Sequence, residues 1–125
     1  MKTIYIAGPF RGVDGFAVYK NVVRAEGLMH ELIGAALDQG TPVAVLCPHS
    51  MTVHLDRTFD DNYWLAATME WLDRSDAILM LPEWEKSMGS TDKRRRAITT
   101  GKAVLSNVQT ALAFLRGEKV GVPID

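Results

Sequence analysis

The sequence predicts a single α/β domain, a three-layer sandwich whose central parallel sheet has four or five strands. Short, nearly continuous apolar runs alternate along the chain with longer segments that have the periodicity of amphipathic helices. Strands that are apolar throughout belong to parallel sheets covered by helices on both faces. The length of 125 residues suits one compact domain, 1–125, and no linker or repeat divides it.

Four strands are expected, each rich in Val, Ile, Leu or Ala, and three of them are followed by a proline. They span residues 3–7, 42–47, 77–81 and 103–105. The first strand of such a sheet is usually central, which gives the strand order 2-1-3-4. This order opens a crevice at the carboxyl ends of strands one and three, where ligands bind in open α/β sheets.

Four helices are expected from the apolar periodicity, at residues 17–39, 63–74, 90–100 and 107–116. Gly40 and Gly101 are typical of helix C-termini. Asp60 or Asp61 is expected to cap the second helix at its N-terminus. The segment 49–61, which lacks a clear period, is expected to be a loop.

The composition of the chain argues against several classes of protein function. The net charge of −1 argues against a protein that binds nucleic acid through its whole surface. The single cysteine, Cys47, excludes a disulfide within the chain and favours a reducing compartment. No window approaches the ~18 apolar residues of a membrane span, and Gly8-Pro9 breaks the short apolar run near the N-terminus. We therefore expect a cytoplasmic protein with no membrane partner, no metal and no cofactor.

The loop after the first strand, Gly8-Pro9-Phe10-Arg11-Gly12, is a candidate ligand-binding segment. Its glycines allow close approach of the backbone to a ligand, and Arg11 can pair with a phosphate or carboxylate. The loop matches neither the Walker A pattern nor GxGxxG. The alternative is an ordinary turn that carries an exposed arginine.

The loop after the third strand is expected to form the opposite wall of the crevice. Ser87, Gly89 and Ser90 lead into the third helix, where free N–H groups and the helix dipole attract anions. Helix capping by Ser87 or Ser90 alone explains a serine here and is the commoner outcome, and capping does not exclude ligand binding. Trp84 in the same loop can stack on a base or a sugar, although a place in the core is the commoner outcome for tryptophan.

Two further groups of residues are candidates. His49 follows the second strand beside the crevice, and its spacing to His54 matches no strong metal signature. The run Lys93-Arg94-Arg95-Arg96 places four cations near a helix N-terminus, against its dipole. Lys93 would favour an anionic ligand, and the alternatives are a solvated helix face or a nucleic-acid contact.

Short segments along nearly the whole chain share one pattern: Tyr5–Phe10, Cys47–His49, Trp64–Leu65, Leu72–Ile78, Leu81–Ser90, and Ala97 with Gly101–Val104. Together they resemble the nucleoside 2-deoxyribosyltransferase-like superfamily, and most of all its small uncharacterised bacterial and phage branch. The resemblance implies a flavodoxin-like or Rossmann-like sheet, a homo-oligomer that is a dimer or higher, and a nucleoside or nucleotide as the small-molecule partner. Characterised members cleave or transfer the N-glycosidic bond of such ligands.

The resemblance also implies two catalytic carboxylates, and the chain departs from it there. In the superfamily a Glu after the Ser-x-Gly turn attacks the anomeric carbon, and an Asp on the preceding helix positions the sugar. Lys93 and Thr68 stand at the corresponding positions. The neighbouring acids, Asp92 and Glu70, are therefore the candidate catalytic residues, although Asp92 lies about 100° further round its helix. Lys93 itself can act through a Schiff base if its pKa is lowered.

Two hypotheses of function follow. The first is an N-glycosidic bond hydrolase or glycosyltransferase that uses the displaced acids. The second is a binding or regulatory module for a nucleoside phosphate that kept the crevice without the catalysis. Free base released from deoxynucleosides or their 5′-monophosphates would distinguish the enzyme from the binding module.

Overall fold

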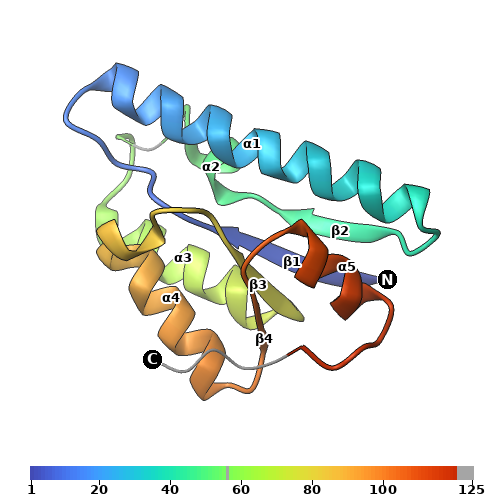
Figure 1. Ribbon diagram of the computed structural model, residues 1–125. Helices are drawn as coiled ribbons and strands as arrows, with labels where there is room; N and C mark the ends of the chain where they lie inside the picture. The colour runs from blue at the N-terminus through green and yellow to red at the C-terminus, as the bar shows by residue number, and fades with distance from the viewer. Residues whose placement is uncertain (56, 121–125) are drawn as a thin grey trace.

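The computed structural model describes residues 1–55 and 57–120 and contains a four-stranded parallel sheet with helices on both faces (Figure 1). The strands are β1 (Lys2–Ala7), β2 (Val43–Leu46), β3 (Ala77–Met80) and β4 (Ala103–Leu105). The helices are α1 (Gly15–Asp38), α2 (Pro48–Thr52), α3 (Asp61–Asp73), α4 (Met88–Thr99) and α5 (Val108–Leu115), and a 3-10 helix, η1, spans Trp84–Lys86.

The strand order is β2-β1-β3-β4, as the sequence predicts, with β1 in the interior of the sheet. Every neighbouring pair is parallel, and Tyr5 lies opposite Leu46 on one side and Ile78 on the other. Each connection crosses over the sheet through at least one helix, which parallel pairing requires. The three-layer α/β class is therefore confirmed.

The two faces of the sheet bury separate parts of the core. On one face Ile4 and Leu79 pack with Leu32 of α1 and Ala111 of α5. The opposite face packs against α3 and α4, and its buried members are Tyr5, Ala7, Ile78, Met80, Val104, Leu72 and Ala97. Alternate residues of β1 thus point to opposite faces, as the pleat of a strand demands.

Glycine ends α1 and α4 in the same way. Gly40 and Gly101 have φ angles of 77° and 75°, in the left-handed region that costs glycine little. The residue after each glycine donates its N–H back into the last turn, from Thr41 to Ala36 O at 3.0 Å and from Lys102 to Ala97 O at 2.9 Å. Both helix ends agree with the prediction.

The structure shows which of the predicted residues cap the N-termini of α3 and α4. Asp60 caps α3 and accepts a hydrogen bond from the N–H of Asn62 at 2.7 Å, which leaves Asp61 as the first helical residue. Ser87 caps α4, because its Oγ accepts from the N–H of Ser90 at 3.2 Å. The helix therefore begins at Met88, two residues before the predicted start.

The segment 49–61 is not entirely a loop. Its first residues, 49–52, belong to α2, which begins at Pro48. Proline suits the first turn of a helix because its ring presets φ and its missing N–H needs no partner there. A helix of five residues is too short to show a period in the sequence.

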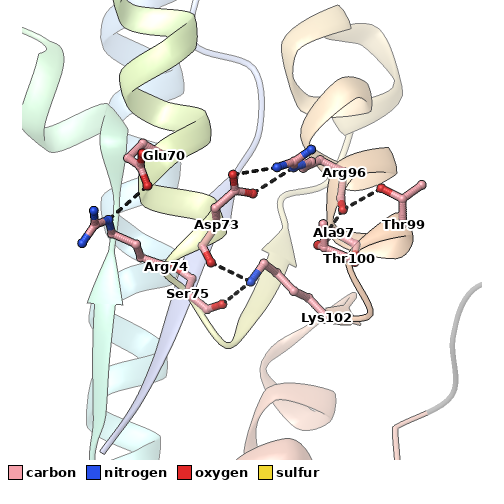
Figure 2. Close-up of polar contacts among 9 residues, drawn as sticks. All are labelled: Glu70, Asp73, Arg74, Ser75, Arg96, Ala97, Thr99, Thr100 and Lys102. Carbon is pink, nitrogen blue, oxygen red and sulfur yellow. Dashed lines mark hydrogen bonds and ion pairs between the residues drawn. The ribbon is translucent and has the colours of Figure 1, made fainter.

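A polar cluster joins the end of α3 to α4 and β4 (Figure 2). The Arg96 guanidinium donates two hydrogen bonds of 2.9 Å to the Asp73 carboxylate and holds the pKa of that carboxyl below its usual value. The Lys102 ammonium donates to the backbone oxygens of Asp73 and Ser75 at 3.0 and 2.6 Å. These carbonyls lie at the C-terminus of α3, where a cation also complements the helix dipole.

Alanine at Gly27 or Gly34 is expected to stabilise the protein. Both glycines are exposed in the interior of α1, and a Cβ added at either meets no atom within 4 Å. Each substitution should raise the free energy of unfolding by ~1 kcal/mol, because glycine is the poorer helix former. Urea unfolding followed by circular dichroism measures the change, and an unchanged or lower midpoint would contradict this account.

Candidate functional site

A cavity of about 430 Å³ lies at the carboxyl end of the sheet. Its floor is the second half of β1, from Tyr5 to Ala7. Its walls are the loop Gly8–Arg11, α2, the first half of α3 and the first half of α4. The N-termini of α1, α3 and α4 lie at this same end of the molecule (Figure 1).

All but one of the predicted ligand-binding residues line this cavity, namely Gly8, Pro9, Phe10, Arg11, His49, Ser87, Gly89, Ser90 and Lys93. They come from three loops or helix starts that the predicted strand order brings together. The sequence therefore predicted where the cavity is. That these residues bind a ligand remains a prediction.

Trp84 is the exception, and its predicted place in the cavity is wrong. Its ring packs against the core cluster under α3 and α4, and the buried Arg94 guanidinium lies 4.7 Å from the ring centroid. The cause is the turn before η1. Glu83 adopts φ 69°, a left-handed conformation that is uncommon outside glycine, and Arg24 and Lys86 pair with its carboxylate at 3.3 and 3.0 Å.

The two displaced acids, Asp92 and Glu70, do not line the cavity, so their catalytic role stays a prediction that this cavity does not support. The Asp92 carboxylate pairs with Arg95 at 3.2 Å, and the Glu70 carboxylate pairs with Arg74 at 3.1 Å. Both pairs are exposed on helix surfaces. One or two residues along a helix turn a side chain about 100° or 200°, which carries both acids away from the cavity.

Lys93 and Thr68 do line the cavity. The ammonium of Lys93 is half-buried, and a Cβ built on Gly89 would lie 3.9 Å both from this Nζ and from the Ser87 Oγ. Burial lowers the pKa of Lys93, while the nearby charge of Asp92 opposes that shift. Thr68 donates its hydroxyl hydrogen to the Trp64 carbonyl oxygen at 2.8 Å. At the two positions where the resemblance implies carboxylates, the groups that line the cavity are therefore a cation, from Lys93, and a hydroxyl, from Thr68.

The family model for a domain of unknown function, DUF4406, matches residues 2–106. The chain belongs to this family. The matched residues include all four strands and every residue that lines the cavity, and they end before α5. Comparison with curated proteins and with solved structures finds no match.

The four consecutive cations of the DUF4406 chain do not form one basic surface. Lys93 lines the cavity, Arg94 packs on Trp84, Arg95 pairs with Asp92, and Arg96 pairs with Asp73. Successive helical residues diverge by about 100°, so each side chain meets a different neighbour. This arrangement gives no support to a nucleic-acid contact through Lys93–Arg96.

His49 is a buried, neutral member of the cavity wall. Its Nε2–H donates to the Pro9 carbonyl oxygen at 3.0 Å, and its ring meets Phe10 edge-on at 5.7 Å between centroids. Burial lowers the pKa of His49, with hydrogen bonds to Pro9 and Gly8 acting in the opposite direction. In the described part of the DUF4406 chain, its Nδ1 has no hydrogen-bond partner.

Asp61 is a site residue whose sequence context indicated only a helix cap. Among the described residues that line the cavity, it is the single carboxylate. It pairs with Arg11 at 2.6 Å across the mouth of the cavity, and both side chains are largely exposed. Its place in the first turn of the helix that follows the second strand was a usable signal, because helix N-termini gather at this end of the sheet.

Two kinds of feature are absent from the residues that the structure describes. No helix among them is long and apolar enough to cross a membrane. No group of three His, Cys, Asp or Glu side chains within residues 1–55 and 57–120 is placed to hold a metal ion. His54 is exposed and lies outside the cavity lining. The polar chemistry described for this DUF4406 cavity is therefore that of side-chain cations, hydroxyls, one imidazole and one carboxylate.

Proposed function

We propose that this DUF4406 domain binds a nucleoside 5′-phosphate in the cavity at the carboxyl end of its sheet. The observation that carries the proposal is the ammonium of Lys93, which stands inside the cavity at the first turns of α4 with no carboxylate paired to it within the described residues. A half-buried cation of this kind is best compensated by an anionic ligand.

The phosphate fits the start of α4. The Ser87 Oγ accepts a hydrogen bond from the N–H of Ser90 at 3.2 Å. The Ser87 carbonyl oxygen accepts one from the N–H of Thr91 at 3.0 Å. The N–H groups of Met88 and Gly89 precede them and are available to an anion at the positive end of the helix dipole. Arg11 at the mouth supplies a second cation.

The nucleoside fits the remaining surface. Phe10, Trp64 and Leu65 give the cavity an aromatic and aliphatic wall, against which a base or a sugar can pack. The hydroxyl of Thr68 and the free Nδ1 of His49 offer polar partners nearby. The volume of about 430 Å³ falls in the range of small-molecule sites. The sequence resemblance supports the same ligand class.

Calorimetric titration tests this proposal. The protein should bind 2′-deoxynucleoside 5′-monophosphates more tightly than the corresponding deoxynucleosides. Lys93→Gln should weaken binding of the monophosphate roughly 10- to 100-fold, because it removes a charged partner worth about 1.5–3 kcal/mol. Lys93→Arg should retain most of the affinity, since the charge stays in place.

Lys20→Gln is the matched control, because Lys20 is exposed on α1 and outside the cavity. Thermal unfolding of each variant shows that it is folded. Equal affinity for phosphorylated and unphosphorylated ligands, or a Lys93→Gln variant that binds like the Lys20→Gln control, would refute the phosphate site.

A second candidate function is N-glycosidic bond cleavage, and Asp61 is the observation that favours it. Glycoside cleavage uses carboxylates, and Asp61 brings one to the cavity. Release of free base from deoxynucleosides or their monophosphates, abolished by Asp61→Asn, would establish this activity. Asp92→Asn and Glu70→Gln are the matched controls and should release base at the unaltered rate, because both acids pair outside the cavity.

A further inference from the structure

Lys93 differs from the other lysines of the chain in the surroundings of its amine. Four other lysines among the described residues have a partner for their ammonium group. Lys2 and Lys102 donate to the backbone carbonyl oxygens of Phe114 and Asp73. Lys20 lies over the ring of Phe16, and Lys86 pairs with the Glu83 carboxylate. Lys93 has no such partner within residues 1–55 and 57–120, and its amine lies within the cavity wall.

The titratable groups that share the cavity lining with this amine are mostly cationic or neutral. The titratable side chains that share the cavity lining are Tyr5, Arg11, His49, Asp61 and Lys86. The single carboxylate among them, Asp61, is paired with Arg11 at the mouth. Burial lowers the pKa of Lys93, and the neighbouring Asp92 carboxylate, which is paired with Arg95 outside the cavity, opposes part of that shift. A larger fraction of its amine is therefore in the neutral, nucleophilic form than for a lysine in water.

We propose that Lys93 is a nucleophile that forms an imine with the open-chain aldehyde of a pentose or pentose phosphate held in this cavity. The inference rests on the proposed function, because a pentose phosphate shares the sugar and the phosphate of the proposed ligand and occupies the same site, while its free anomeric carbon allows it to open to an aldehyde. It goes beyond that function by adding a covalent step at a named atom.

The step is balanced without any further reagent. The lone pair of the neutral Nζ forms a bond to the aldehyde carbon, and the carbonyl π electrons move to oxygen, which takes up a proton. The resulting carbinolamine loses that hydroxyl as water while the nitrogen gives up its remaining proton. One amine and one aldehyde thus give one imine and one water, and hydrolysis reverses the reaction.

The neighbours of the amine suit a sugar phosphate. Ser87 Oγ and Lys93 Nζ lie on the same side of Gly89, at equal distances of 3.9 Å from the position of a Cβ there. The hydroxyl of Ser87 can accept a hydrogen bond from a sugar hydroxyl without leaving the N-cap. When a pentose phosphate takes the place of the nucleotide, the first N–H groups of α4 and Arg11 can hold its phosphate without Lys93, and the aldehyde end then reaches the amine.

Reductive trapping tests the proposal. The full chain is incubated with ribose 5-phosphate, or with ribose in a second arm, in the presence of sodium cyanoborohydride, which reduces an imine to a stable secondary amine. Intact mass should rise by one sugar phosphate less one oxygen atom, and digestion should place the adduct on Lys93. A lowered pKa raises the neutral fraction of the amine, and the cavity holds the sugar beside it, so near neutral pH Lys93 should be labelled in preference to every other lysine.

Two variants sharpen the test. Lys93→Arg keeps the positive charge but forms no stable imine, and it should lose the adduct. Lys20→Arg should label like the unaltered chain. A modification spread evenly over the lysines, or its persistence in Lys93→Arg, would overturn the inference, as would the absence of any adduct.

Calorimetry of the same proteins separates this inference from the proposed function. Nucleoside monophosphates that bind to a protein in which Lys93 is never trapped would refute the imine alone. An adduct confined to Lys93 in a protein that binds no nucleoside monophosphate would refute the nucleotide site alone. Stronger trapping by ribose 5-phosphate than by ribose would assign the phosphorylated sugar as the substrate class.

Discussion

Gly8→Ala is expected to destabilise the protein by about 1–3 kcal/mol or more, because it overpacks a tightly closed part of the core. A Cβ at Gly8 would lie 2.6 Å from the Cβ of Leu81, which is buried and follows directly after β3. The two segments are drawn together by a hydrogen bond of 2.8 Å from the N–H of Leu81 to the Ala7 carbonyl oxygen. Relief of the clash requires β1 and β3 to separate at the floor of the cavity.

Chemical unfolding in urea measures this effect, and Gly15→Ala is the control. Gly15 lies at the start of α1, just after the same loop, and a Cβ there meets no atom within 4 Å. Gly15→Ala should therefore leave the unfolding midpoint nearly unchanged. Equal midpoints for the two variants would show that the approach of Gly8 to Leu81 is not a constraint on the fold.

The second large effect is a pH dependence of stability that arises from His49. Burial lowers the pKa of His49 in the folded state, whereas an unfolded histidine titrates at about 6.5. Between these two pKa values the unfolded chain binds more protons than the folded chain. The free energy of unfolding is therefore fully developed above pH ~6.5 and decreases as the pH falls through this window.

His49→Gln should reduce this pH dependence and cost about 1–3 kcal/mol at pH 7.5, since it disturbs a buried hydrogen bond to Pro9. Unfolding free energies measured in urea from pH 7.5 to pH 5 give both quantities. His30→Gln is the control, because His30 is exposed on α1 and should leave the pH profile as it is. A profile unaltered by His49→Gln would assign the acid sensitivity to other groups.

Much of the fold could be read from the chain because local and global signals agree. Apolar runs and helical periods gave the elements, and the tendency of β1 to be central gave the strand order. The short helix α2 escaped detection because five residues carry no period. Trp84 packs against the core, which is the commoner outcome for tryptophan, whereas no sequence pattern indicates the left-handed backbone of Glu83.

The site was predictable where topology decides and unpredictable where single side chains do. Gly8, His49 and Ser87 meet at the cavity because each follows a strand of a parallel sheet. The registers of Lys93 and Thr68 came from the resemblance, and the structure places both in the cavity. The pairing of Arg11 with Asp61 links residues 50 positions apart, which no local pattern records.

For the proposed phosphate ligand, the pair of Arg11 and Asp61 would make binding at the mouth an exchange of one anion for another. A phosphate that takes the Arg11 guanidinium competes with the Asp61 carboxylate, which already contacts it at 2.6 Å. The net gain in Coulomb energy when the phosphate binds is then smaller than it would be for an arginine without a carboxylate partner. Added salt weakens the Arg11–Asp61 pair and the Arg11–phosphate pair alike. Selectivity for a phosphate at this position would therefore depend on how its geometry and charge differ from those of the Asp61 carboxylate, more than on its attraction to the arginine.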